Sequence, residues 1–208
     1  MHEAGHFFGA RRHQLSLRPP LLLPSSSLGC LGGHSRLASY PTNRTALYDY
    51  AILGPLAGGA ASLACFGVGL SLTAISPSLA ALPQLPLSTL HLSLGASLLT
   101  ELVLGAPSAA DAASSIAPCI PLHPLAIAGL AGILSNALAC LPVGRLDGGR
   151  AAIAAYGRRS AAALGGASLL LLGLAALISD EPSLALPAWA ALCFPLFRQV
   201  CISAVSLP

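Results

Sequence analysis

Apolar residues dominate this chain in long runs, which are separated by short stretches rich in proline, glycine or charge. Four runs are long enough to cross about 30 Å of hydrocarbon as helices. They predict membrane-spanning segments near residues 50–75, 122–141, 160–178 and 184–205. Residues 2–10 predict one more short helix, which is followed by an arginine-rich segment. The pattern therefore predicts an all-α membrane protein, a polytopic transmembrane helix bundle.

Two stretches do not fit this helical pattern. Residues 18–41 contain several prolines and a glycine-rich run, which break helices, so we expect a short irregular or hairpin segment after the first helix. Residues 83–121 are interrupted by prolines and by acidic side chains. For this part we expect a loop that carries one apolar helix at the membrane surface, near residues 90–104.

The composition supports a chain that faces lipid. Hydrophobic residues make up 55% of the 208 residues and charged residues only 8%, whereas soluble proteins carry about 25% charged residues. The chain has too few charged residues to cover the surface of a soluble protein. We therefore expect the lipid bilayer to be a partner. The net charge of +3 is small and scattered, which argues against nucleic acid as a partner. The length predicts a single domain over residues 1–208.

A short motif at the start of the chain carries the first candidate chemistry. His2-Glu3-Ala4-Gly5-His6 has the form His-Glu-x-x-His, which on a helix places two imidazoles on one face, with Cβ atoms about 5–6 Å apart. Both side chains can then bind one Zn²⁺ through nitrogen, and Glu3 can reach a metal-bound water. The motif also occurs by chance in unrelated helices, so it does not establish a zinc site by itself.

A second motif, at residues 146–150, supplies a carboxylate. An ionisable residue at the end of an apolar span is costly unless it is paired or metal-bound, so Asp147 is a candidate third ligand, with the fourth position left open for water. Pro142 is expected to end the preceding helix, and Gly148-Gly149 to let the backbone pass close to the metal. The alternative role for Asp147 is a helix cap or an arginine partner.

Asn136 lies on the same run, eleven residues before Asp147. Its carboxamide is a candidate catalytic group, because it can bind the substrate backbone or a developing oxyanion. An asparagine in an apolar helix can equally serve as a hydrogen-bonding residue between helices. The sequence leaves both roles open.

Taken together, the two motifs resemble those of a known family. The pairing of His2-Glu3-x-x-His6 with Asn136-x5-Pro142-x3-Leu146-Asp147-Gly148 is similar to the site-2 protease family of intramembrane zinc metallopeptidases. Shorter runs resemble the plastid branch of that family, the ethylene-dependent gravitropism-deficient and yellow-green type; these are residues 6–13, 19–20, 52–58 and 146–150. The resemblance covers a core of residues 2–160 and leaves extra C-terminal helices over 160–206.

The resemblance implies a membrane-embedded zinc metalloendopeptidase. His2, His6 and Asp147 would hold the cofactor Zn²⁺, Glu3 would act as the general base, and Asn136 would help to hold the substrate strand. The substrate would be another membrane protein, cut at a peptide bond in or near a transmembrane segment. The plastid likeness further implies an integral, multi-pass protein of a chloroplast membrane, either thylakoid or envelope.

Two features depart from the family pattern. Apolar turns precede the first motif in the family, whereas only Met1 precedes it here, so we expect the natural protein to extend upstream and this chain to be N-terminally truncated. Arg145 places a cation two residues before Asp147, where it could lower metal affinity or pair with substrate. These departures motivate an alternative function, a catalytically silent protease-like scaffold or chaperone, or a truncated gene product.

Overall fold

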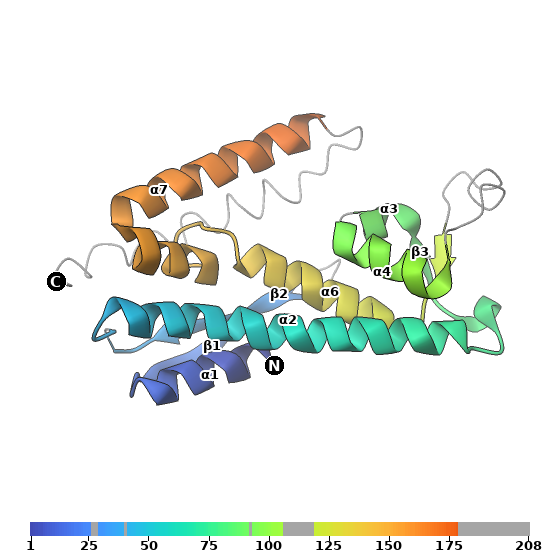
Figure 1. Ribbon diagram of the computed structural model, residues 1–208, viewed down its shortest axis with the longest axis horizontal. Helices are drawn as coiled ribbons and strands as arrows, with labels where there is room; N and C mark the ends of the chain where they lie inside the picture. Colours follow the sequence, from blue (N-terminus) through green and yellow to red (C-terminus); the bar gives the residue numbers. More distant parts are fainter. Residues whose placement is uncertain (26–28, 40, 92, 106–118, 179–208) are drawn as a thin grey trace. The chain divides into compact units, whose positions relative to one another are not determined.

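The computed structural model describes residues 1–25, 29–39, 41–91, 93–105 and 119–178 (Figure 1). The chain divides into two compact units. The first comprises Met1–Gly58 and the chain from Asn136 onward, and the second comprises Gly59–Ser135. The long helix α2, Arg44–Ala74, contributes residues to both units.

The first unit begins with a short helix and a hairpin. Helix α1, His2–Arg12, leads into the antiparallel strands β1, Leu17–Ser25, and β2, Gly29–Leu37. Both the short helix and the hairpin after it were predicted from the sequence, and both are confirmed. The prolines of β1 remove backbone donors, and the strand pairing is irregular where they occur.

Glycines allow α1 to pack closely against the first half of α2. A Cβ atom at Gly5 would collide with the carbonyl group of Leu53, and one at Gly9 would lie 3.2 Å from the Cα atom of Tyr50. Gly5 and Gly9 are one turn apart and therefore share a face, as in the small-xxx-small pattern of closely packed membrane helices. At the other end of α1, His13 Nε2 and Asp49 Oδ2 form a hydrogen bond of 2.8 Å.

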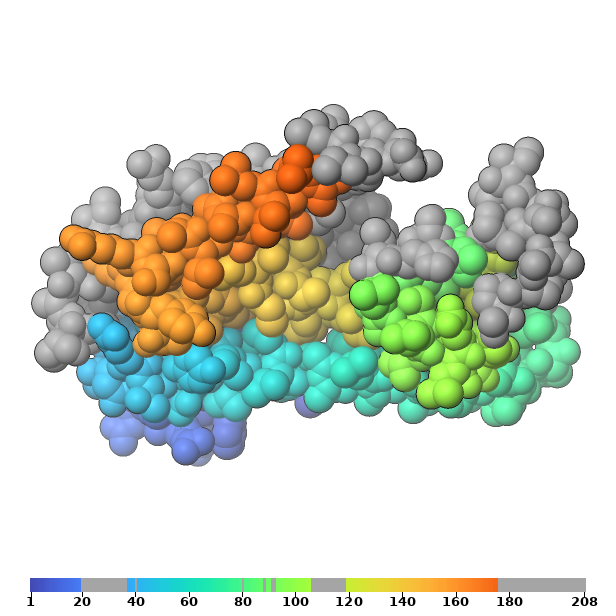
Figure 2. Space-filling view, turned by 45° about the horizontal axis from the view of Figure 1, so that its top comes forward, coloured from blue at the N-terminus to red at the C-terminus, as the bar shows by residue number. Residues whose placement is uncertain are grey.

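The second unit includes the later half of α2. It contains a 3₁₀ turn η1, Leu79–Ala81, helices α3, Leu87–His91, and α4, Leu94–Leu104, and a small antiparallel sheet of β3, Gln84–Pro86, with β4, Cys119–Pro121. The expected apolar helix near residues 90–104 is α4, seen in green in Figure 2. The core of this unit combines α2, α3, α4 and the following helix α6 through Phe66, Leu70, Leu90, Ala96, Leu122, Ala126 and Leu130.

Helix α6, Pro124–Ala139, ends before Pro142, as predicted, and a short loop leads to α7, Asp147–Ile178. The role expected for Gly148-Gly149 is different in the structure. A Cβ atom at Gly148 would collide with the carbonyl group of Cys140, and one at Gly149 would lie 2.5 Å from the carbonyl oxygen of Gly144. These glycines therefore allow the first turn of α7 to pack on the loop before it, which holds Asp147 in place.

The structure is mostly helical, and among the described residues α2 is the helix long and apolar enough to cross a membrane. It has 31 residues, and an 18-residue window within it has a mean hydropathy of 1.7. The spans predicted at 122–141 and 160–178 fall on α6, which is shorter, and on the part of α7 that follows a break at Gly157. The span predicted at 184–205 lies outside the described residues. A bundle of several membrane spans therefore stays a prediction.

Candidate metal centre

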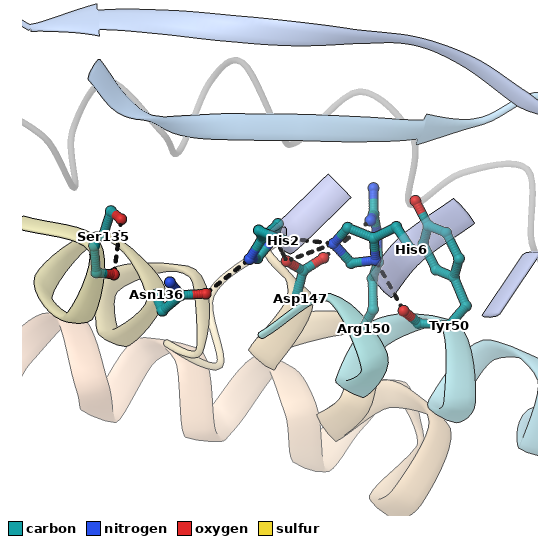
Figure 3. A network of polar contacts seen from close by, with 8 residues as sticks. His2, His6, Tyr50, Ser135, Asn136, Asp147 and Arg150 are labelled. Carbon is teal, nitrogen blue, oxygen red and sulfur yellow. Dashed lines mark hydrogen bonds and ion pairs between the residues drawn. The ribbon is translucent and has the colours of Figure 1, made fainter. Parts of the chain in front are cut away.

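Three predicted ligands meet within the first unit. His2 and His6 point from α1 toward Asp147, the first residue of α7 (Figure 3). The two histidine Nε2 atoms are 3.0 Å apart, and Asp147 Oδ2 lies 3.1 Å from His2 Nε2 and 3.2 Å from His6 Nε2. The four-residue spacing on α1 aligns the two rings, and the end of the loop after α6 brings in the carboxylate.

Hydrogen bonds on the far side of each ring set the histidine tautomers. His6 Nδ1–H donates to the backbone carbonyl of Tyr50 at 2.9 Å, and His2 Nδ1–H donates to Asn136 Oδ1 at 2.8 Å. Carbonyl and amide oxygens only accept hydrogen bonds, so each Nδ1 carries the proton. Each Nε2 therefore directs its lone pair at the other two atoms of the cluster.

This cluster of three atoms fits a zinc ion. Three electron-pair donors facing one another at 3.0–3.2 Å repel unless a cation lies among them. Zn²⁺ binds nitrogen and oxygen at about 2.0–2.2 Å, and tetrahedral bonds of that length separate the ligand atoms by about 3.3–3.6 Å, slightly more than the separations here. Two histidines and one carboxylate also match the ligand number of a catalytic zinc site, which keeps a fourth position open.

The second carboxylate oxygen of Asp147 is bound by an arginine. Arg150 Nη1 donates to Asp147 Oδ1 at 3.2 Å, and both side chains are buried. The guanidinium also lies over the ring of Tyr50, 5.4 Å from its centre, and that ring packs against His6 at a centroid distance of 4.8 Å. The arginine pairing that was an alternative to metal binding is therefore compatible with it, because each role uses a different oxygen.

Two glycines of α2 make room for the histidines, and their role in the site was not predicted. A Cβ atom at Gly54 would collide with the imidazole of His6, and one at Gly58 would lie 2.9 Å from His2 Cβ and 2.5 Å from Asn136 Oδ1. The four-residue spacing of Gly54 and Gly58, which matches that of Gly5 and Gly9 on α1, was the signal for two helices in close contact beside the site.

Glu3 lies on α1 between the two histidines in sequence. Its side chain is half-buried, and one of its carboxylate oxygens is fully buried. Arg145 is also half-buried, in the loop before Asp147. Of the other four histidines, His13 bonds to Asp49, and His123 Nδ1 accepts a hydrogen bond from the backbone N–H of Leu125 at the start of α6.

The model of peptidase family M50 matches residues 1–178 of the chain, which includes every residue of this cluster. The chain belongs to peptidase family M50, the site-2 protease family. The similarity that the sequence motifs suggested is thereby confirmed.

Several curated proteins are similar to the chain. It is 33% identical over 205 residues to the probable zinc metalloprotease EGY1, chloroplastic, of Oryza sativa subsp. japonica, covering 99% of the chain and 34% of that protein. It is 34% identical over 186 residues to the Arabidopsis thaliana protein of the same name, covering 89% and 32%. Identity to the probable zinc metalloprotease EGY2, chloroplastic, of Arabidopsis thaliana is 36% over 180 residues, covering 86% and 31%.

The chain thus spans about a third of the length of these relatives. No solved structure gave a significant match.

Proposed function

We propose that this M50 chain is a zinc metalloendopeptidase that hydrolyses peptide bonds in or near transmembrane segments of other membrane proteins. The observation that carries the proposal is the convergence of His2 Nε2, His6 Nε2 and Asp147 Oδ2 within 3.0–3.2 Å of one another. The names of the relatives, which are probable zinc metalloproteases, support both the metal and the reaction class.

Zn²⁺, when bound, would polarise the carbonyl group of the scissile bond and lower the pKa of a water toward about 7. Its ligands would be His2, His6 and Asp147. Arg150 would keep Asp147 Oδ1 away from the metal, so that the carboxylate binds through Oδ2 alone. The charges of Asp147 and Arg150 also balance each other, which lowers the cost of burying them.

Glu3 would supply the proton transfers. As general base it would take a proton from the attacking water, whose oxygen joins the carbonyl carbon. As the C–N bond breaks, the same carboxyl group would return that proton to the leaving nitrogen. Its place on the helix that carries both histidines keeps it near the reacting atoms. A substrate helix has to unwind locally first, because its carbonyl groups are otherwise engaged in helical hydrogen bonds.

The proposed setting is a chloroplast membrane, thylakoid or envelope, with the chain embedded as a multi-pass protein. The relatives named as chloroplastic support the compartment. The long apolar helix α2 and the apolar helices α4 and α6 support the membrane. The bilayer and a membrane-protein substrate are then the partners, and no nucleic acid is involved.

Replacing the general base tests the proposal, because Glu3→Gln keeps the shape of the side chain but cannot accept a proton. The chain purified in detergent is expected to hold one zinc per chain and to cleave labelled casein or a synthetic transmembrane peptide. Glu3→Gln should keep the zinc and lose at least about 100-fold in cleavage rate. Asp147→Ala should lose both zinc and cleavage.

The alternative, a silent scaffold, predicts a different result. Zinc would still bind, but neither the wild-type chain nor Glu3→Gln would cleave these substrates. A wild-type chain that binds no zinc would contradict the proposed metal site itself.

A further inference from the structure

Asn136, in the last turn of α6, is directed at the ring of His2 rather than at the place where the metal would lie. Its Oδ1 atom accepts the hydrogen bond from His2 Nδ1–H at 2.8 Å (Figure 3). We propose that Asn136 is a positioning residue that holds His2 in the ring orientation and tautomer needed for zinc binding. This inference rests on the proposed function and assigns Asn136 a role other than oxyanion binding.

The chemistry of the contact favours positioning. An oxyanion has to be stabilised by a hydrogen-bond donor, whereas the Asn136 atom that faces His2 is an acceptor. Because this atom accepts a hydrogen bond from Nδ1–H, the proton of the neutral ring is on Nδ1. The lone pair is then on Nε2, which faces His6 and Asp147. Metal-binding histidines commonly have such a partner, and removing it typically weakens metal binding by about 10–100-fold.

His2 depends on this support more than His6 does. The His6 side chain is 1% exposed, and its Nδ1–H bonds to the backbone of Tyr50, which no side-chain substitution removes. The His2 side chain is 18% exposed, and the partner of its Nδ1–H is a side chain, which a substitution can remove. A side-chain amide from another helix holds the Nδ1 side of this ring.

The glycine at position 58 provides a second, independent observation. A Cβ atom there would lie 2.5 Å from Asn136 Oδ1 and 2.9 Å from His2 Cβ, so α2 has room for this contact only because position 58 has no side chain. A Cβ atom at Gly59, the next residue, would meet nothing within 4 Å. The contact between Asn136 and His2 therefore requires a glycine at position 58 but not at position 59.

Zinc affinity, measured by competition with a chromophoric chelator on the full chain in detergent, tests the inference. Asn136→Leu keeps the approximate size but removes the acceptor, and should weaken zinc binding by about 10–100-fold. Asn136→Asp keeps an acceptor and adds charge, and should bind zinc at least as tightly as wild type. Ser135→Ala is the matched control, because Ser135 lies beside Asn136 on α6 and bonds only locally to Gly132; its affinity should be unchanged.

A glycine pair gives a second test that leaves Asn136 intact. Gly58→Ala should weaken zinc binding by displacing the amide from His2, whereas Gly59→Ala should not. If Asn136→Leu fails to fold, unchanged zinc affinity in Gly58→Ala would contradict the inference.

The outcomes separate this inference from the proposed function. Wild-type zinc affinity in Asn136→Leu, with reduced cleavage, would overturn the positioning role and return Asn136 to a catalytic or substrate-binding one. A wild-type chain without zinc would instead overturn the metal site, and the positioning role with it.

Discussion

At the scale of single residues, the two carboxylate oxygens of Asp147 have different partners in the site. Oδ2 faces the histidines, and Oδ1 is held by Arg150. Burying a carboxylate without a partner is costly. The arginine and a bound zinc ion would therefore both compensate the buried charge of Asp147. When one of these cations is present, removal of the other should cost less stability.

This sharing predicts that Arg150→Gln destabilises the zinc-free protein far more than the zinc-loaded protein. In the zinc-free form it leaves Asp147 without its cation, and removing one partner of a buried pair typically costs about 3–5 kcal/mol. In the loaded form the metal supplies positive charge, so the loss should be smaller. Thermal unfolding with zinc and with chelator measures both values. Arg159→Gln, at an exposed position further along α7, is the control; equal losses of stability for Arg150→Gln in the two forms would contradict the prediction.

At the scale of secondary-structure elements, the site depends on how closely α1 approaches α2. Glycines at positions 5 and 9 of α1 and 54 and 58 of α2 permit that approach. The local elements could be predicted from the sequence, because prolines exclude a helix over the hairpin and the apolar runs mark the helices. The short strands β3 and β4 were not predicted, since three-residue segments leave no periodic pattern.

Gly54→Ala is predicted to damage the site through His6. The added methyl group would collide with the His6 imidazole, and overpacking of this kind typically costs about 1–3 kcal/mol. We expect less than one zinc per chain by metal analysis and a lower unfolding temperature. Gly67→Ala on the same helix meets open space, so it should keep its zinc and match or exceed wild-type stability. Full zinc content in Gly54→Ala would show that α2 can move away without cost.

At the scale of the whole molecule, the candidate site belongs to the first unit alone. Its residues come from α1, α2, the end of α6 and the start of α7. The sequence predicted the ligand set only because two distant motifs together resemble one family. It could not assign Asn136, Arg150 or Gly54, because their roles follow from which atom faces which ring, and no spacing along the chain encodes that.

Because the site joins distant segments of one unit, zinc should stabilise the fold as a whole. A ligand that binds only the folded chain adds about 4.1 kcal/mol when present at 1,000 times its dissociation constant. Zinc is therefore expected to raise the unfolding temperature of the wild-type chain in detergent, a chelator to reverse the rise, and Asp147→Ala to abolish it.

A change in the second unit supplies the control for this effect. Leu130 is 2% exposed in the core of that unit, so Leu130→Ala should cost about 2–5 kcal/mol and lower the unfolding temperature. It leaves His2, His6 and Asp147 untouched, and so the zinc-induced rise should persist. If Asp147→Ala and wild type showed the same rise, zinc would be acting elsewhere on the protein. A rise that Leu130→Ala retains and Asp147→Ala loses would place the stabilising metal at the three-ligand cluster.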